Sequence, residues 1–147
     1  MIRAFQPSDT DAWAKMRAQL WPGADAELER EARDFSRGLL TPTLEVVFIA
    51  ENAGERVGFL EISVRSFSDG CESMPVPHVE GWYVQPHARG SGIGRSLMQA
   101  AETWSRERGF TELASDTEIH NAASLRAHQR CGFEEVERLI KLRKSLA

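Results

Sequence analysis

The sequence predicts a mixed β-sheet flanked by helices, an α/β (α+β) domain of three layers. Segments of alternating apolar residues, typical of strands, occur between segments in which apolar residues recur every three or four positions, typical of amphipathic helices. The order of these segments is strand, helix, helix, three strands, helix, strand, helix, strand, which favours helices packed on a sheet. At 147 residues the chain has the size of one domain, so residues 1–147 are predicted to form a single domain.

The N-terminal part is predicted to form a short strand and two helices. Residues 1–5 have a strand pattern, and Ser8 and Asp11 have the spacing of a capping pair that begins a helix ending near Leu20. Trp13 and Leu20 recur at helical spacing and are expected in the core. A second amphipathic helix is predicted over 26–39, with a stop signal at 38–42.

Three strands are predicted next. Residues 44–51 and 56–66 are expected to be antiparallel neighbours, joined by a hairpin in which Gly54 supplies a positive φ. Residues 67–77 have the composition of a loop, and a further strand is predicted over 79–84, before Pro86.

The C-terminal half is predicted to begin with a helix over 93–108, followed by Gly109 at its C-terminal end. A strand over 111–116 and a helix over 122–130 follow, and one or two closing strands are predicted within 133–143. An exposed edge strand near 136–143 would allow two copies of the chain to pair through their sheets.

Composition and charge narrow the class of protein. Hydrophobic residues make up 41% and charged residues 27%, the balance of a soluble globular protein, and no apolar run is long enough for a membrane span or a secretory signal. A cytoplasmic protein is therefore expected. The net charge of −4 argues against nucleic acid and suits a cationic ligand. Cys71 and Cys131 lack the spacing of a metal site or a disulfide framework, so no metal is expected.

A glycine-rich loop lies between a predicted strand and a predicted helix. It reads Arg89-Gly90-Ser91-Gly92-Ile93-Gly94, and its backbone N–H groups and the helix dipole can converge on a phosphate. Its GxGxG spacing is neither that of a P-loop nor that of a dinucleotide fold. A tight strand-to-helix turn that binds nothing would explain the same glycines.

Two motifs together resemble the GNAT superfamily of N-acetyltransferases. The phosphate motif of that family, Q/R-x-x-G-x-G/A, is matched by Arg89, Gly92 and Gly94. A later helix motif, N-x-x-A-x-x-x-Y-x-x-x-G-F, is matched by Asn121, Gly132 and Phe133 and departed from at Ser124 and His128. The order of elements fits as well, so the resemblance covers nearly the whole chain.

The resemblance implies that acetyl-CoA binds in a V-shaped opening between parallel strands 79–84 and 112–116. The residues that it places against this cosubstrate are Trp82, Tyr83, Val84, Arg89, Gly90, Ser91, Gly92, Ile93, Gly94, Arg95 and Asn121.

The reaction implied is direct attack of an amine on the thioester, with no covalent enzyme intermediate. A group must then accept the ammonium proton, and an acid must protonate the leaving thiolate. The family usually has a tyrosine as that acid, and His128 stands at its position here. A histidine that only packs or caps a helix is the alternative.

The acceptor is predicted to be cationic. Residues 66–88 and 111–125 contain acids and no lysine or arginine, which would attract a polyamine, although ordinary surface acids would give the same composition. Strand alternation places Glu80 and Asp116 toward the opening, as candidates to bind the ammonium or relay its proton. The predicted substrate-binding residues are Trp21, Phe67, Glu72, Glu80 and Asp116.

Further local matches resemble the aminoglycoside 6′-N-acetyltransferases, a chromosomally encoded subgroup in particular. They are Leu20 to Gly23, Asp69 to Ser73, Glu80-Gly81 and Ala114 to Thr117. This implies acetylation of the 6′-amine of drugs such as kanamycin and tobramycin, antibiotic resistance, and a homodimer. A transferase for a polyamine or a protein amine remains open, as does a non-catalytic module that senses acyl-CoA.

Overall fold

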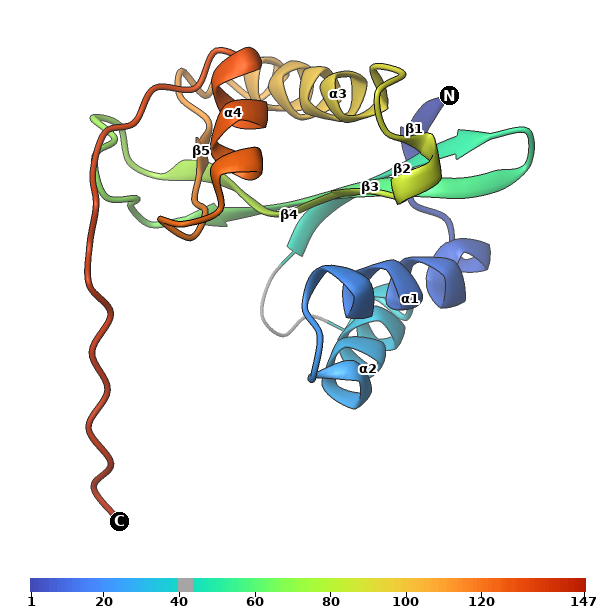
Figure 1. Ribbon diagram of the computed structural model, residues 1–147, viewed down its shortest axis with the longest axis horizontal. Helices are drawn as coiled ribbons and strands as arrows, with labels where there is room; N and C mark the ends of the chain where they lie inside the picture. Colours follow the sequence, from blue (N-terminus) through green and yellow to red (C-terminus); the bar gives the residue numbers. More distant parts are fainter. Residues whose placement is uncertain (40–43) are drawn as a thin grey trace.

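The computed structural model describes residues 1–39 and 44–147 and confirms the predicted fold class. In this part of the chain a five-stranded sheet has the order β1-β2-β3-β4-β5, antiparallel except for the parallel pair β4–β5. Helices α1 and α2 cover one face and α3 and α4 the other (Figure 1). The elements are β1 (Ile2–Ala4), α1 (Thr10–Leu20), α2 (Asp25–Ser36), β2 (Leu44–Asn52), β3 (Glu55–Arg65), β4 (Val76–Val84), α3 (Ile93–Glu107), β5 (Ala114–Ser115) and α4 (Ala122–Arg130), with short 3-10 helices η1 (Pro7–Asp9) and η2 (Pro86–Ala88).

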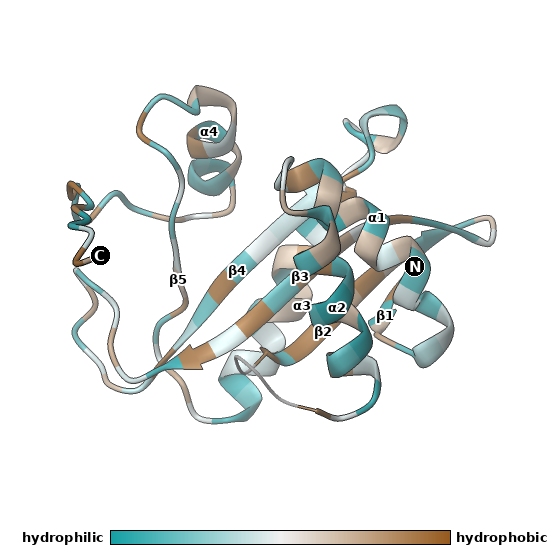
Figure 2. Cartoon of the chain, turned by 90° about the horizontal axis from the view of Figure 1, so that it is seen from below, coloured by the Kyte–Doolittle hydropathy of each residue, from teal (hydrophilic) through white to brown (hydrophobic). Residues whose placement is uncertain are grey.

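Each face of the sheet has its own core. Trp13 is fully buried between α1, α2 and the sheet, and Leu20 packs at the margin of this cluster. Leu97 and Ala101 of α3 are buried on the opposite face. The strands β2 to β4 carry the apolar stretches, and hydrophilic residues mark the outer sides of α1 and α2 (Figure 2). The amphipathic periods of these helices thus predicted their buried sides correctly.

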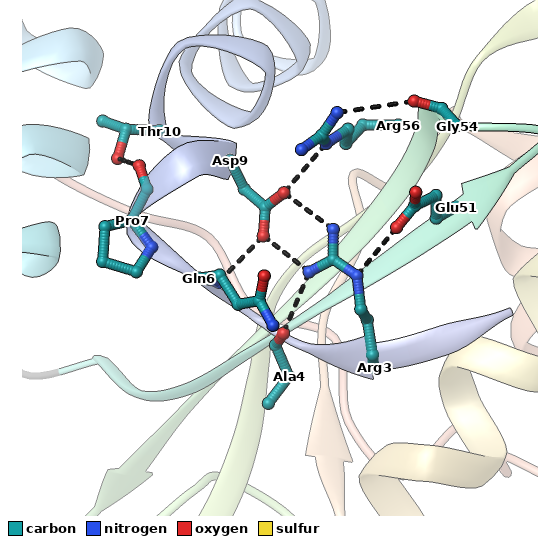
Figure 3. Close-up of polar contacts among 9 residues, drawn as sticks. All are labelled: Arg3, Ala4, Gln6, Pro7, Asp9, Thr10, Glu51, Gly54 and Arg56. Atoms are coloured by element: carbon teal, nitrogen blue, oxygen red, sulfur yellow. Dashed lines mark hydrogen bonds and ion pairs between the residues drawn. The ribbon is translucent and has the colours of Figure 1, made fainter.

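The entry to α1 differs from the prediction. Ser8 lies inside η1, and α1 begins at Thr10, so Ser8 and Asp11 are not its capping pair. The buried carboxylate of Asp9 makes the main polar contacts here. It accepts a hydrogen bond from the Gln6 N–H at 2.8 Å and forms ion pairs with Arg3 and Arg56 at 2.7 and 2.9 Å (Figure 3). These pairs connect η1 to β1 and β3, contacts that a local capping pattern does not contain.

The hairpin between β2 and β3 is confirmed. Gly54 has a φ of 80° and Ala53 a φ of 50°, so both turn residues occupy the left-handed region. β4 begins at Val76, earlier than predicted, and therefore includes His78. The predicted strand 111–116 shrinks to Ala114–Ser115, because the segment pairs with β4 only at these residues. The predicted stop of the second helix falls partly on residues outside the described ranges.

The predicted closing strands within 133–143 are wrong for the single chain. Residues 133–147 have no regular secondary structure and leave the sheet as an extended tail (Figure 1). A strand forms only beside another strand that can hydrogen-bond to it, and β5, the edge strand here, is only two residues long. Apolar side chains of the tail are left exposed, namely Val136, Leu139, Ile140, Leu142 and Leu146.

Candidate active site

The strands β4 and β5 separate in the way expected of a ligand-binding splay. They pair only through His78 with Ala114 and Val79 with Ser115, after which β4 continues to Val84 without β5 beside it. Strand β3 satisfies the other edge of β4. Among the described residues, no strand pairs with β4 beyond Val79 on the β5 side, so backbone groups of 80–84 can bind a ligand there.

The glycine-rich loop enters α3 in a conformation that requires glycine at two positions. Gly90 and Gly92 have φ values of 83° and 85°, and Gly92 directly precedes the first residue of α3. A Cβ at either position would meet no atom within 4 Å, so the backbone conformation, not crowding within the chain, explains these glycines. In the described part of the chain, the N–H groups of 90–94 donate no backbone hydrogen bond, and they lie at a helix N-terminus, where an anion is favoured.

Side chains around the loop fix its position on β4. The Arg89 Nε donates to the Val84 carbonyl oxygen at 2.8 Å, and the Ser91 hydroxyl donates to the Ala88 carbonyl at the same distance. The Trp82 indole N–H donates to the Gly94 carbonyl at 3.0 Å, which joins β4 to the first turn of α3. The loop and the splay thus form one continuous surface.

Three residues predicted to bind the cosubstrate make structural contacts with their side chains. The Arg95 guanidinium donates to the Arg130 carbonyl at 3.1 Å. The Asn121 carboxamide oxygen caps α4 by accepting from the Ser124 N–H at 3.1 Å. The Tyr83 hydroxyl donates to the Gln19 carboxamide at 2.8 Å on the opposite face of the sheet, so Tyr83 can offer only backbone groups to the splay.

His128 lies on α4 at the margin of the splay and is buried. Its ring packs edge-on against Trp82, with ring centroids 5.0 Å apart. Nδ1 is 2.7 Å from the Ser124 carbonyl oxygen, which can only accept, so the neutral ring carries its proton on Nδ1. Nε2 then accepts from the Ser115 hydroxyl, 2.8 Å away. Ser115 was not among the predicted site residues; it pairs with Val79 at the last point where β4 and β5 meet.

A β-bulge turns Glu80 toward the face of the sheet that carries α1. Glu61 pairs with Gly81 and Ile62 with Val79, which leaves Glu80 as the extra residue of β4. The side chains on this face include Arg65 and Ser63 of β3, both of which reach the Glu80 carboxylate. We call this surface, with Trp21 and Asp116, the acceptor face, after the amine-binding role that the sequence predicts for its residues.

Glu80 is not a free anion. The Arg65 guanidinium donates to both of its carboxylate oxygens at 2.9 and 2.8 Å, and the Ser63 hydroxyl donates to one of them. Burial acts to raise the pKa of Glu80, but these hydrogen bonds outweigh it and hold the pKa below its ordinary value. Arg65 directly precedes the acidic segment 66–88, so counting charges inside that segment missed it.

Asp116 lies just beyond β5 and is the more exposed of the two carboxylates. Its side chain is 69% exposed, and Oδ2 is 3.3 Å from Nε2 of His78, whose side chain is 3% exposed. The interaction with His78 contributes most to lowering the pKa of Asp116, against the effect of burial. The structure therefore brings Glu80 and Asp116 to one face and gives each a cationic or basic neighbour that the sequence did not reveal.

The other predicted acceptor residues differ in their surroundings. The Trp21 ring lies against Gly81, where a Cβ would come within 2.8 Å of it, and Arg17 stacks 5.3 Å from the ring centroid. Phe67 is exposed on the loop after β3. The Glu72 N–H donates to the Glu112 carboxylate at 2.9 Å, so Glu112 anchors this loop instead of standing free in an acidic rim.

Comparisons with known proteins agree with this geometry. Residues 10–133 match the model of the acetyltransferase (GNAT) family. The chain belongs to the GNAT family. The aminoglycoside N(6′)-acetyltransferase type 1 of Stenotrophomonas maltophilia is 44% identical, over 99% of this chain and 93% of that protein, and the one of Klebsiella aerogenes is 41% identical, over 99% and 97%. The structure of AAC(6′)-Iy with the bisubstrate analog CoA-S-monomethyl-acetylneamine has a TM-score of 0.88 and 36% identity, covering 99% of this chain and 97% of that one.

The chain is thus a GNAT acetyltransferase, with acetyl-CoA as its acetyl donor. The residues present fit this molecule. Its pyrophosphate suits the open amides of 90–94 before α3, and the amides of its pantetheine arm suit the unpaired edge of β4. In residues 1–39 and 44–147, no cluster of three or more His, Cys, Asp or Glu side chains could hold a metal ion. No helix in those ranges is long and apolar enough to span a membrane.

Gly81 offers a test of the acceptor face in this GNAT enzyme. A Cβ added there would approach Trp21 to 2.8 Å and Phe59 to 3.1 Å, so the Trp21 ring must move. Gly81→Ala is expected to destabilise the fold by about 1 kcal/mol and to raise KM for the amine about 5-fold. KM for acetyl-CoA serves as the internal control and should stay unchanged. Equal effects on both Michaelis constants would show that Trp21 does not contact the acceptor.

Proposed function

We propose that this acetyltransferase acts on the 6′-amino group of aminoglycoside antibiotics and so confers resistance to them. The names of its relatives and the acetylneamine portion of the analog bound to AAC(6′)-Iy support this substrate class. The observation that carries the proposal is the exposed Asp116 carboxylate on the acceptor face, beside the splay that fits the acetyl donor. An aminoglycoside is a polycation, which such a carboxylate attracts.

The proposed reaction uses groups on both sides of the splay. Asp116 holds the substrate ammonium, while Glu80, already paired with Arg65, contributes less free negative charge. After one proton leaves, the neutral amine attacks the thioester carbon and the C–S bond breaks. A proton reaches the thiolate through the Ser115 hydroxyl, which takes one in turn from Nε2 of His128, 2.8 Å away, when that ring is the imidazolium; the ring is left neutral. Direct attack of this kind needs no nucleophile on the enzyme.

The deciding experiment follows free thiol release from acetyl-CoA with tobramycin, spermidine and a lysine peptide as parallel acceptors. An aminoglycoside with a 6′-hydroxyl in place of the amine is the matched control. Rapid release with tobramycin alone supports the proposal. Release with spermidine or the peptide instead would assign a polyamine or protein amine, and acetyl-CoA binding without release on any acceptor would favour a sensing module.

We also propose that residues 1–147 form one domain that works as a cytoplasmic homodimer. Cys71 and Cys131 are free thiols, which suits a reducing compartment. The tail after Phe133 exposes apolar residues such as Ile140 and Leu142 beside a sheet whose last strand is short. Adding this tail as a strand to the partner's sheet would bury both features at once.

Ile140→Glu is expected to convert the dimer to a monomer, because it places a charge on an apolar contact. Ser145→Glu adds the same charge at a polar position of the tail and should leave the dimer intact. Sedimentation over a range of concentrations measures both. A wild-type protein that is monomeric at every concentration would rule the dimer out.

A further inference from the structure

His78 is a buried titratable side chain that the proposed reaction leaves unused. It lies on β4 opposite Ala114 of β5, at the last point where the two strands still pair. Nε2 is 3.3 Å from Asp116 Oδ2, within ion-pair distance, yet this buried atom has no hydrogen-bond partner of good geometry. Nδ1 is 3.5 Å from the Ser68 hydroxyl. A buried polar atom without a partner is costly and calls for an explanation.

Charged groups surround this imidazole on several elements. Arg65 extends from β3 and pairs with Glu80 of β4, while Asp116 follows β5. The positive charge of Lys141 in the tail also acts on Asp116. Because Arg65 and Glu80 largely neutralise each other, Asp116 is the charge that faces Nε2 directly.

The Asp116 carboxylate therefore contacts both solvent and the buried ring of His78. Its exposed side can receive a substrate ammonium from solvent, and its other side is in reach of a ring that solvent hardly touches. An imidazolium formed in that position would have a carboxylate beside it, which compensates the cost of a buried positive charge.

We propose that His78 and Asp116 form one proton-accepting unit, in which Asp116 binds the acceptor ammonium and its proton passes on to Nε2 of His78. This inference rests on the proposed function. The N–H bond of the ammonium breaks, an N–H bond forms on the neutral imidazole, and the products are a neutral amine and an imidazolium–carboxylate pair. The amine then forms the C–N bond, and the imidazolium releases its proton to water after turnover.

Histidine suits this step better than either carboxylate. Hydrogen bonds from Arg65 and Ser63 hold the pKa of Glu80 below the ordinary range, and the neighbouring His78 holds that of Asp116 below it, so these carboxylates bind cations well and retain protons poorly at neutral pH. An imidazole ordinarily changes its charge between pH 5 and 8. Since His78 acts through Asp116, it is a positioning residue that also stores the proton.

The test compares His78→Gln with the wild type across pH 5.5 to 8.5. Glutamine can donate a hydrogen bond to Asp116 but cannot take up a proton. We expect kcat to fall about 10-fold at pH 7 while KM for the amine changes less than 2-fold, because loss of a positioned proton acceptor affects the chemical step. The acid limb of kcat/KM should disappear. Thermal melting checks the fold, and His78→Asn replaces the variant if His78→Gln does not fold.

A second arm requires no turnover. NMR titration of the His78 ring in the whole protein is expected to move to lower pH in Asp116→Asn, because the neighbouring charge that favours the imidazolium is gone. An unchanged titration would overturn the proposal, as would a wild-type pH profile and kcat in His78→Gln. A higher KM with unchanged kcat would also overturn it, since His78 would then only place Asp116.

Failure of this inference can be told apart from failure of the proposed substrate class. If tobramycin is not acetylated, the pH profiles are recorded with whichever amine of the parallel panel is accepted. The NMR arm decides in every case whether the two side chains titrate as one unit.

Discussion

Asp116→Asn is expected to lower kcat/KM for tobramycin about 100-fold. The substitution keeps the shape of the side chain and removes the charge that faces both solvent and His78. A hydrogen bond between charged groups contributes about 1.5–3 kcal/mol, and the variant also loses its part in removing the ammonium proton, so about 3 kcal/mol is expected in the transition state. KM for acetyl-CoA should stay within 2-fold, because the glycine-rich loop follows the C-terminal end of β4, whereas Asp116 contacts His78 near the start of that strand.

Glu118→Gln is the matched control. It removes one negative charge from the same acidic segment, but the Glu118 side chain is exposed and pairs only with the exposed His120 in the described part of the chain. Steady-state kinetics should place this variant within 2-fold of the wild type. If the two variants lost activity equally, the effect would come from the overall charge, and Asp116 would have no specific role.

The conformation of the glycine-rich loop was predictable because its signal is local. The glycines at 90 and 92, the strand before them and the helix after them are adjacent in sequence, and the structure reproduces the positive φ values and the start of α3. These features depend on short-range geometry, which a sequence pattern contains.

The neighbours of the two carboxylates were not predictable in the same way. The bulge at Glu80 shifts the phase of β4, and only the register with β3 shows that Arg65 meets this carboxylate. His78 falls outside the strand predicted to begin at residue 79. Its proximity to Asp116 depends on how far β4 and β5 pair, a long-range property of the sheet.

The C-terminal tail was predicted to contain strands but forms none in the single chain. Residues 133–143 have an apolar pattern typical of a strand, yet a strand forms only where another strand offers backbone partners. In one chain the tail lies apart from the sheet (Figure 1). The pattern therefore describes a propensity to form a strand, which a second copy would satisfy in the proposed dimer.

Asp9→Asn is expected to lower the free energy of unfolding by about 3 kcal/mol at pH 7, the lower end of the range for a broken buried ion pair. The carboxylate is fully buried and holds Arg3, Arg56 and the Gln6 N–H together (Figure 3). Both arginines are partly exposed, so solvent compensates some of the loss. Denaturant unfolding followed by circular dichroism measures the change.

The pH dependence of this effect has a definite sign. Burial alone would raise the pKa of Asp9, but Arg3 and Arg56 outweigh it and hold the pKa well below its ordinary value. A carboxyl whose folded pKa is depressed stabilises the fold above its unfolded pKa of about 3.9, and this contribution is lost as the pH falls toward the folded pKa. The difference between wild type and Asp9→Asn should therefore be constant from pH 5 to 7 and shrink below about pH 4.

Asp11→Asn is the control for this stability experiment. Asp11 lies two positions along the chain from Asp9, but its side chain is exposed and is 3.7 Å from the Arg33 guanidinium. An exposed pair of this kind contributes less than about 0.5 kcal/mol, so the two variants should differ by more than 2 kcal/mol. Because Asp9 lies at the entry to α1, far along the chain from the glycine loop, the folded Asp9→Asn protein should keep its KM for acetyl-CoA. A loss of stability as small as that of Asp11→Asn would show that Arg3 and Arg56 are satisfied by water instead of by Asp9.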